Sequence, residues 1–254
     1  MKVRFLSDSE TSCTAVIEGI SAPFANALRR VIMTEIPVYA GKDIIIYENS
    51  GPLFDEVIAH RIGLVPLTTP KDSSEDSKSV IISIDVAGPS MVTSADFVSE
   101  DPDVVPTSDG FPIVKIGKGQ RLKCNIEGVV GYGKDHMRWQ PGLASYKNYP
   151  SIVIDTVQCN LCGSCIKACP RALIQKAGDV LTVVDAGSCM FCRACEEACA
   201  QSNEKSLISV TPLKDVFIFM VESYGAMPAK DLLSTALMVI ENKARALDQN
   251  LSGA

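Results

Sequence analysis

The placement of cysteine is the feature that most limits how this chain can fold. Eight of the ten cysteines fall into two runs with one pattern, C-x-x-C-x-x-C-x-x-x-C. The first run is Cys159, Cys162, Cys165 and Cys169, and the second is Cys189, Cys192, Cys195 and Cys199. Three thiolates at this short spacing can surround one face of an iron–sulfur cube from a single loop. The fourth comes three residues later, where we expect a helix to have begun, so it points away from the other three.

This direction predicts two [4Fe–4S] clusters whose ligand sets are exchanged between the runs. Cluster 1 takes Cys159, Cys162, Cys165 and Cys199, and cluster 2 takes Cys189, Cys192, Cys195 and Cys169. The spacing is that of a bacterial-type ferredoxin with two clusters. Pro170 follows the first run as in that pattern, but Ala200 follows the second. Between the runs, residues 179–184 read as a short β segment.

Zinc sites and disulfides are the alternative uses of so many cysteines. Structural zinc usually pairs two C-x-x-C knuckles across a longer gap, which leaves the third cysteine of each run unused. Disulfides belong to oxidising compartments, whereas Met1–Glu10 is short, mixed and charged, unlike a secretory signal. We therefore favour iron–sulfur over zinc and both over disulfides, and we expect a reducing, cytoplasmic location.

The composition describes an ordinary globular chain without an evident catalytic motif. It is 46% hydrophobic and 21% charged, which suits one to three domains with a core. The net charge of −6 disfavours broad electrostatic binding to nucleic acid, so little direct contact is expected. No apolar run approaches the ~18 residues of a membrane span. Motifs for nucleotide binding, serine hydrolysis and zinc proteolysis are absent from the sequence, so we predict no catalytic site.

We call the segment that holds the two cysteine runs the cassette, and the rest of the chain the host. The host is predicted to form helices and short strands. Helical spacing covers Ser21–Ile36 and Phe54–Ile62. Strands are expected at 3–6, 14–17, 43–47, 80–86, 113–116 and 122–126, and loops at 94–110 and 131–142. Strands at 151–155 and 207–210 flank the cassette, which predicts an insertion at the tip of a hairpin. Cys13 and Cys124 are expected to be core or edge residues rather than ligands.

The C-terminal segment predicts a strand over 215–222 followed by a helix from Ala229 to about Asn250. One face of this helix carries apolar residues three or four positions apart: Leu233, Leu237, Ile240, Ala244 and Leu247, with Ala236 and Leu251 in the same stripe. The stripe can pack inside the chain or onto a partner. Periodicity alone does not distinguish these two possibilities.

Two host segments resemble a known family. Asn26-Ala-Leu-Arg-Arg30, followed by Ile36-Pro37, resembles the hallmark helix of α-type RNA polymerase subunits. Residues 54–67 are similar to the matching stretch in the archaeal and eukaryotic branch. A ferredoxin-like insert in such a host is a feature of the archaeal D-type family of these polymerase subunits. The resemblance covers essentially the whole chain.

The resemblance implies an α+β fold with a discontinuous architecture. Residues 1–42 and 213–254 would form a dimerisation domain, and 43–157 with 207–212 an inserted β-rich domain. Residues 158–206 would form a ferredoxin-like iron–sulfur domain that carries the two [4Fe–4S] clusters. The Leu233–Leu251 stripe becomes an intermolecular surface under this resemblance.

The resemblance also implies a non-catalytic assembly platform. Such a subunit pairs with subunit L, and the pair then receives the small subunits N and P and the large catalytic subunits. Arg29, Arg30, His60 and Arg61 become candidates for contacts with a large subunit, with internal salt bridges as the rival interpretation.

Two functions of different classes follow from these observations. In the first, the chain is a scaffold whose clusters stabilise a cassette too short to fold comfortably on its own core, which would make assembly sensitive to oxidation. In the second, the chain is a ferredoxin-type electron-transfer subunit of a redox enzyme. The large host, which carries no flavin, haem or nicotinamide motif, favours the scaffold.

Overall fold

The computed structural model describes residues 1–203 and 205–252, and within it the chain divides into two compact units. The first unit comprises Met1–Arg4, Ala15–Ala22 and Tyr146–Phe219. The second comprises Phe5–Thr14, Pro23–Ser145 and the chain from Met220 onward. Glu204 of the expected iron–sulfur domain, and Gly253 and Ala254 of the expected dimerisation domain, lie outside the described residues. No helix in the described part of the chain is both long and apolar enough to span a membrane.

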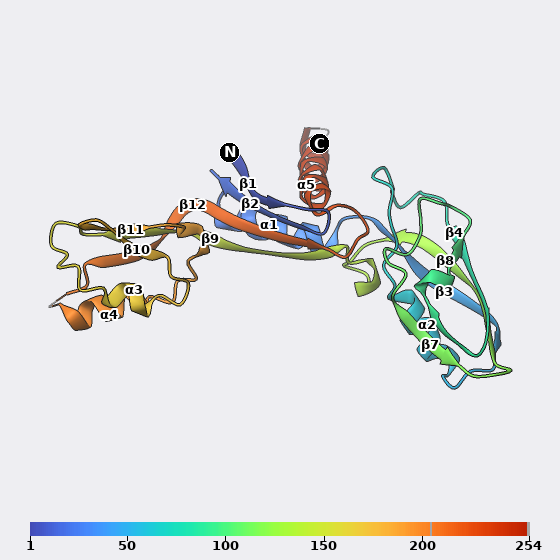
Figure 1. Ribbon diagram of the computed structural model, residues 1–254. Helices are drawn as coiled ribbons and strands as arrows, with labels where there is room; N and C mark the ends of the chain where they lie inside the picture. Colours follow the sequence, from blue (N-terminus) through green and yellow to red (C-terminus); the bar gives the residue numbers. More distant parts are fainter. Residues whose placement is uncertain (204, 253–254) are drawn as a thin grey trace. The chain divides into compact units, whose positions relative to one another are not determined.

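Helices and strands both contribute, as expected for an α+β chain (Figure 1). The helices are α1 (Ala22–Thr34), α2 (Asp55–Gly63), α3 (Ser164–Ala168), α4 (Ala194–Ser202) and α5 (Ala229–Ser252). The strands are β1 (Lys2–Asp8), β2 (Ser12–Glu18), β3 (Val38–Asn49), β4 (Val80–Ala87), β5 (Ser90–Thr93), β6 (Val98–Ser99), β7 (Pro112–Ile116), β8 (Arg121–Gly131), β9 (Gly142–Ile154), β10 (Ile174–Ala177), β11 (Val180–Val183) and β12 (Ile208–Ser223). They form sheets in the orders β1-β2-β12-β9, β3-β8-β4-β6, β5-β7 and β10-β11.

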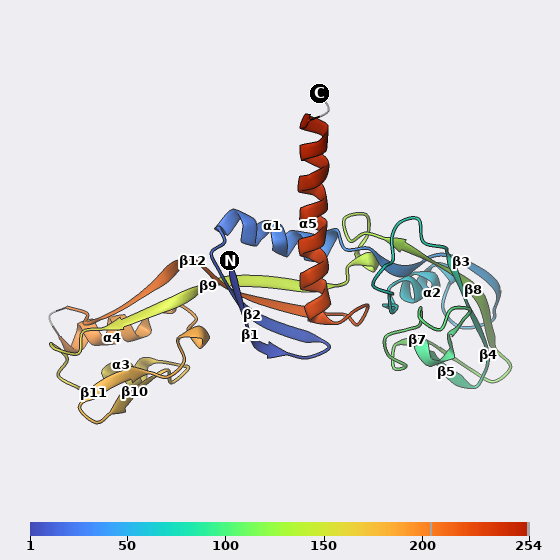
Figure 2. The same cartoon turned by 90° about the horizontal axis from the view of Figure 1, so that it is seen from above.

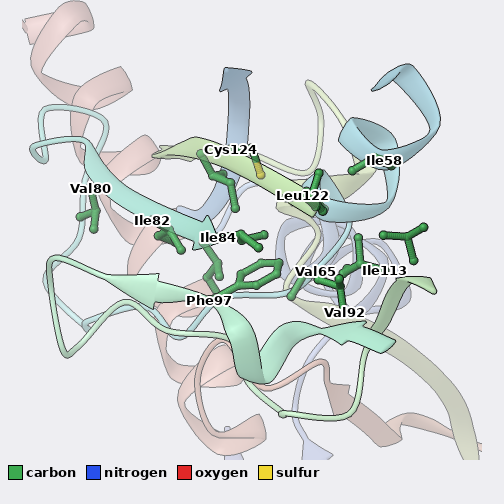
Figure 3. Packing of buried hydrophobic residues seen from close by; sticks show 14 of the residues in the cluster. Ile58, Val65, Val80, Ile82, Ile84, Val92, Phe97, Ile113, Leu122 and Cys124 are labelled. Carbon is green, nitrogen blue, oxygen red and sulfur yellow. The ribbon is translucent and has the colours of Figure 1, made fainter. Parts of the chain in front are cut away.

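The second unit has its core on one face of the β3-β8-β4-β6 sheet. In the antiparallel register, Cys124 of β8 lies between Ile46 of β3 and Ile84 of β4. Alternate residues of β8 are buried, as its period of two predicts. Helix α2 adds Ile58 to the same apolar cluster, which Figure 3 shows from close by. Cys124 is therefore a core residue, as expected, and burial raises the pKa of its thiol to about 11.

The two helices expected in the first third of the chain are confirmed. Helix α1 buries Ala25, Leu28, Val31 and Ile32, which recur at helical spacing. Helix α2 begins and ends within one residue of the expected bounds. Acidic residues lie in its first turn, and His60 and Arg61 lie in its last turn, so both ends complement the helix dipole.

The strands around the cassette are longer than the sequence predicts. The expected strands at 207–210 and 215–222 are one strand, β12, which continues through Pro212. Asp215 within it has a φ of 58°, so the chain stays in the sheet through a local irregularity rather than a loop. Strand β9 begins at Gly142, well before the expected start at 151. Strand β10, which pairs with the expected β11, was not predicted.

The Gly/Pro-rich segment 131–142 is ordered by its side chains. The indole of Trp139 is 9% exposed and donates from Nε1 to the Val129 carbonyl at 3.1 Å. Arg138 donates from Nη1 to the Gly41 carbonyl at 2.6 Å. The Nδ1 of His136 accepts from the Arg138 backbone N–H at 3.1 Å, so this histidine caps a 3₁₀ turn. The segment therefore fastens β8 to the start of β3.

Helix α5 is packed only along its first part. Its buried residues are Ala229, Leu232, Leu233 and Ala236. From residue 241 to 252 every position is exposed, including Ala244 and Leu247 of the apolar stripe. Figure 2 shows α5 as one straight helix. Ala244, Leu247 and Leu251 of the predicted stripe are thus uncovered in the isolated chain.

We predict that Ile82→Ala destabilises the second unit by about 2–5 kcal/mol, because Ile82 is 0% exposed and its truncation leaves a cavity. Ile45→Ala is the matched control, since Ile45 lies in the same sheet but is 60% exposed. We expect its effect to stay within about 0.5 kcal/mol. The chain contains a single tryptophan, so Trp139 fluorescence during denaturant unfolding reports on this unit. Equal effects of the two substitutions would contradict the assignment of the core.

Candidate metal centre

The two cysteine runs lie on loops that lead into α3 and α4, beside the β10–β11 hairpin (Figure 1). The cassette leaves the host after β9 and returns at β12, which are neighbours in one sheet. The Asp155 N–H donates to the Leu207 carbonyl at 2.9 Å, so the two ends of the cassette lie side by side. This confirms the expected insertion at the ends of paired strands.

The first run encloses a cavity together with the last cysteine of the second run. Cys159, Cys162 and Cys165 line it with Cys199, and Leu181 and Ile208 close its apolar side. Burial is the main cause that raises the pKa of Cys165, and the nearby thiol of Cys199 adds to the increase.

The second run encloses a second cavity in the same way. Cys189, Cys192 and Cys195 line it with Cys169. Burial, with smaller contributions from Cys169 and Cys189, raises the pKa of Cys195 to about 11. A metal that binds thiolates must therefore displace protons from these groups. Each cavity gathers four thiols, three from one run and one from the other, and four thiolates are the donors that a [4Fe–4S] cluster takes.

The two runs share a backbone conformation that suits an anionic group. Leu161 and Gly163 have φ values of 58° and 76°, and the equivalent Phe191 and Arg193 have φ values of 59° and 58°. Left-handed residues alternating with ordinary ones curl a loop so that its N–H groups converge, as at many iron–sulfur sites. Non-glycine residues hold this conformation at a cost, so its repetition at matched positions points to a functional constraint.

The same residues begin the two short helices. The Gly163 carbonyl accepts from the N–H groups of Ile166 and Lys167, and the Arg193 carbonyl accepts from those of Glu196 and Glu197. The third cysteine of each run therefore lies in a first helical turn. The repeat ends at the fourth cysteine, because Cys199 lies within α4 whereas Cys169 directly follows α3.

Pro170 explains this difference between the two helices. A residue before proline is biased towards extended backbone, and Cys169 has φ −78° and ψ 110°. Ala200 imposes no such limit, so α4 continues to Ser202. The expectation that a helix has begun before the fourth cysteine holds in both runs, but the helix ends just before that cysteine in the first.

Backbone amides also approach the sulfur of each exchanged cysteine. The Leu173 N–H donates to the Cys169 Sγ at 3.5 Å, and the Leu207 N–H donates to the Cys199 Sγ at 3.3 Å. Hydrogen bonds to the sulfurs are one of the means by which a protein adjusts an iron–sulfur cluster. The donor set and its surroundings therefore fit an iron–sulfur cluster in each cavity.

The second run is fastened to the host strands by two side chains. Lys147 of β9 donates from Nζ to the carbonyls of Gly187 and Cys189, at 2.8 and 2.9 Å. Glu196 of α4 accepts a hydrogen bond from the Val210 N–H of β12. The position of this loop therefore depends on the strands from which the cassette emerges.

The other candidate residues from the sequence do not form a common site. Arg29 donates to Asn26 within α1, and Arg61 donates from Nη1 to the Ile113 carbonyl at 2.7 Å. Arg30 and His60 are exposed. No contact joins these four side chains within the described residues, and no three His, Cys, Asp or Glu there surround the position of a single metal ion.

Sequence reasoning missed three polar residues around the thiols: Lys147, Asn160 and Asn203. Asn160 lies inside the first run and Asn203 lies four residues after Cys199, so spacing gave a usable signal for both. Lys147 precedes the cassette by about a dozen residues, in the first part of β9, which was not predicted. Only the fold brings its ammonium group to the second loop.

Two known protein families match this chain, one over the host and one over the cysteine runs. Residues 44–157 match the RNA polymerase Rpb3/RpoA insert domain. Residues 151–200 match the 4Fe-4S dicluster domain. These matches confirm the mixed α+β fold with an inserted β-rich domain and an iron–sulfur domain.

Archaeal relatives match the chain over nearly its full length. DNA-directed RNA polymerase subunit Rpo3 of Pyrococcus horikoshii is 36% identical over 251 residues, which cover 96% of this chain and 95% of the relative. The Rpo3 subunit of Methanothermobacter thermautotrophicus is 37% identical and that of Archaeoglobus fulgidus is 34% identical. They cover 96% and 98% of this chain, and it spans 96% and 97% of their lengths.

The fold and the two thiol-lined cavities thus define an α-type RNA polymerase subunit that carries a dicluster iron–sulfur domain. The chain belongs to the family of archaeal DNA-directed RNA polymerase subunits Rpo3, the D-type subunits. This confirms the resemblance drawn from the two host segments and the cysteine runs.

We predict that Arg193→Gly stabilises the cassette, because Gly adopts the left-handed conformation that costs other residues about 1–2 kcal/mol. Loss of its exposed ion pair with Glu196 (3.9 Å) offsets little of this gain. Gly163→Ala is the reciprocal variant and should destabilise the first loop by a similar amount. Anaerobic thermal unfolding of the full chain measures both. Destabilisation by Arg193→Gly would contradict the strain attributed to this position.

Proposed function

We propose that the chain is a non-catalytic assembly-platform subunit of an archaeal DNA-directed RNA polymerase, working in the cytoplasm. The observation that carries this proposal is the match to Rpo3 subunits over 96% of the chain. The sequence contains no motif of an active site, and a net charge of −6 gives no broad surface for nucleic acid. The large subunits would supply the catalytic centre.

Pairing with subunit L is the first step of this role. The dimerisation domain would comprise residues 1–42 and 213–254, around a partly uncovered α5. Leu247 and Leu251 are 61% and 70% exposed on its apolar stripe. Burying side chains of this size in an interface contributes roughly 1.5–3 kcal/mol each before ordering costs. This uncovered half of α5 supports an intermolecular use of the stripe that includes Leu233, Leu237, Ile240 and Ala244.

The pair would then bind subunits N and P and the large catalytic subunits. The inserted β-rich domain would comprise 43–157 and 207–212. Arg30 and His60 are exposed on α1 and α2, where they can reach a large subunit. Arg29 and Arg61 each retain an intramolecular hydrogen bond, so a partner would share or replace it. Arginine forks suit polar interfaces of this kind.

Two [4Fe–4S] clusters would hold the ferredoxin-like domain, residues 158–206, together. The ligands would be exchanged: Cys159, Cys162, Cys165 and Cys199 for cluster 1, and Cys189, Cys192, Cys195 and Cys169 for cluster 2. The lining of the two cavities supports this assignment. Because the ligands come from distant parts of the cassette, cluster binding is coupled to its folding. Oxidative loss of the clusters would therefore loosen the cassette and reduce assembly.

We predict that Leu247→Glu weakens binding of subunit L by about 2–4 kcal/mol, since it places a carboxylate on the apolar stripe. Gln249→Glu is the matched control, because two residues along a helix point to nearly opposite sides. Its binding should stay close to that of the unmodified chain. Titration of the purified chain with subunit L gives both dissociation constants. Unchanged binding by Leu247→Glu would exclude this surface as the interface.

We predict that Cys162→Ser and Cys192→Ser each lower the yield of assembled polymerase while the activity per assembled enzyme stays unchanged. Each removes one ligand from a different cavity, at an exposed position where the substitution itself disturbs little packing. Cys13→Ala removes a thiol outside the runs and controls for loss of a cysteine. Reconstitution from separately purified subunits measures yield and activity.

Full assembly of both variants would contradict the coupling between clusters and assembly. Recovery of the unmodified chain with a flavoprotein or a hydrogenase, and not with polymerase subunits, would instead favour an electron-transfer subunit. The two results are distinguished by the proteins that co-purify with the chain from its own cells.

A further inference from the structure

The two thiol-lined cavities are related by the sequence repeat but differ in polarity. Site 1 denotes the cavity with Cys199, and site 2 denotes the cavity with Cys169. Asn160 follows the first cysteine of site 1, where Met190 stands in site 2. Asn203 lies four residues after Cys199, whereas Leu173 lies four residues after Cys169. At both positions an amide side chain in site 1 replaces an apolar one in site 2.

Asn203 connects the exchanged cysteine of site 1 to the first loop. Its Nδ2 donates to the Cys199 carbonyl at 2.9 Å and approaches the Cys199 Sγ at 3.7 Å. Its Oδ1 accepts from Asn160 Nδ2 at 3.1 Å. Asn160 in turn accepts the Cys162 N–H on Oδ1 at 3.2 Å. Two amides thus form a continuous bridge between α4 and the loop that carries the other three thiols.

Site 2 has a different residue beside its exchanged cysteine, Cys169. The Leu173 side chain is 7% exposed and belongs to the apolar cluster of the cassette, so only its backbone N–H meets the Cys169 sulfur. The lining of this cavity includes Arg171 and Arg193, whereas site 1 has no basic residue among its described lining residues. Both sites thus have a backbone N–H at the exchanged cysteine, but only site 1 adds side-chain amides.

An N–H directed at a cluster sulfur has a defined effect. It stabilises the more electron-rich reduced state, so hydrogen bonds to the sulfurs raise the reduction potential of the cluster. Groups that orient the ligands also retain the metal, and losing one typically costs 10–100-fold in affinity. A side chain that has both effects at one ligand changes the reduction potential and the metal retention of that cluster alone.

We propose that Asn203, held by Asn160, is the positioning residue of site 1 that sets the reduction potential and the retention of its cluster. This inference rests on the proposed binding of two clusters with exchanged ligands. Asn203 fastens Cys199 to the loop of Cys159, Cys162 and Cys165, and directs an N–H at its sulfur. The cluster of site 1 is therefore tuned independently of the cluster of site 2.

The test is a redox titration of the full chain, purified without oxygen and followed by electron paramagnetic resonance. Asn203→Leu copies the residue of site 2. It should lower the equilibrium constant for reduction of one cluster about tenfold, or about 59 mV for one electron. Iron release from that cluster to a chelator should become about tenfold faster. The other cluster should keep its potential and its release rate.

Leu173→Asn is the reciprocal variant and should change only the other cluster. If Asn203→Leu purifies without its cluster, Asn160→Met removes the support of Asn203 and leaves its N–H in place, so a smaller shift is expected at the same cluster. Two clusters with unchanged potentials and release rates in Asn203→Leu, or in Asn160→Met if it is needed, would overturn the role of Asn203 alone. Absence of iron from the unmodified chain would overturn the proposed clusters themselves.

Discussion

The exchange of the fourth cysteine between the two runs is the constraint on which the cassette depends. Cys199 lies beside the first loop, and Cys169 lies beside the second. Neither set of four thiols exists until α3, α4 and the β10–β11 hairpin have come together. The buried cysteines pack in one small hydrophobic core with few apolar residues, among them Leu173, Ile174 and Leu181. A core this small contributes little stability, so we propose that ligand bonds supply the difference.

The cassette is also attached to its host by direct contacts. Its ends meet at Asp155 and Leu207, which directly follow β9 and directly precede β12, two neighbouring strands of one sheet. Lys147 reaches from β9 to the loop of the second run, and Glu196 reaches from α4 to β12. Folding around the thiols therefore positions the ends of both strands. A change in the cassette can affect a host whose proposed task is to bind other subunits, without any chemistry in the host itself.

Much of this organisation could be predicted from the sequence, and the failures have physical reasons. Cysteine spacing predicted which four thiols line each cavity, although their binding of clusters stays a prediction. Helical spacing predicted α1 and α2. The strand assignment was less complete, because two separate strands were expected where β12 is a single strand with an irregularity at Asp215. Lys147 could not be assigned a role, since the Gly187 and Cys189 carbonyls that accept its hydrogen bonds lie 40 and 42 residues away in sequence. Polar contacts between distant segments depend on the fold and leave little local pattern.

The central claim is tested most directly by counting clusters in a double variant. Cys162→Ala and Cys199→Ala belong to different runs, but with exchanged ligands they belong to the same site. The double variant, purified without oxygen and analysed for iron, sulfide and paramagnetic resonance, should then keep one intact [4Fe–4S] cluster. Each single variant should lose the same cluster and keep the same spectrum. Loss of both clusters in the double variant, with different clusters lost in the single variants, would show that each run binds its own metal and would contradict the account.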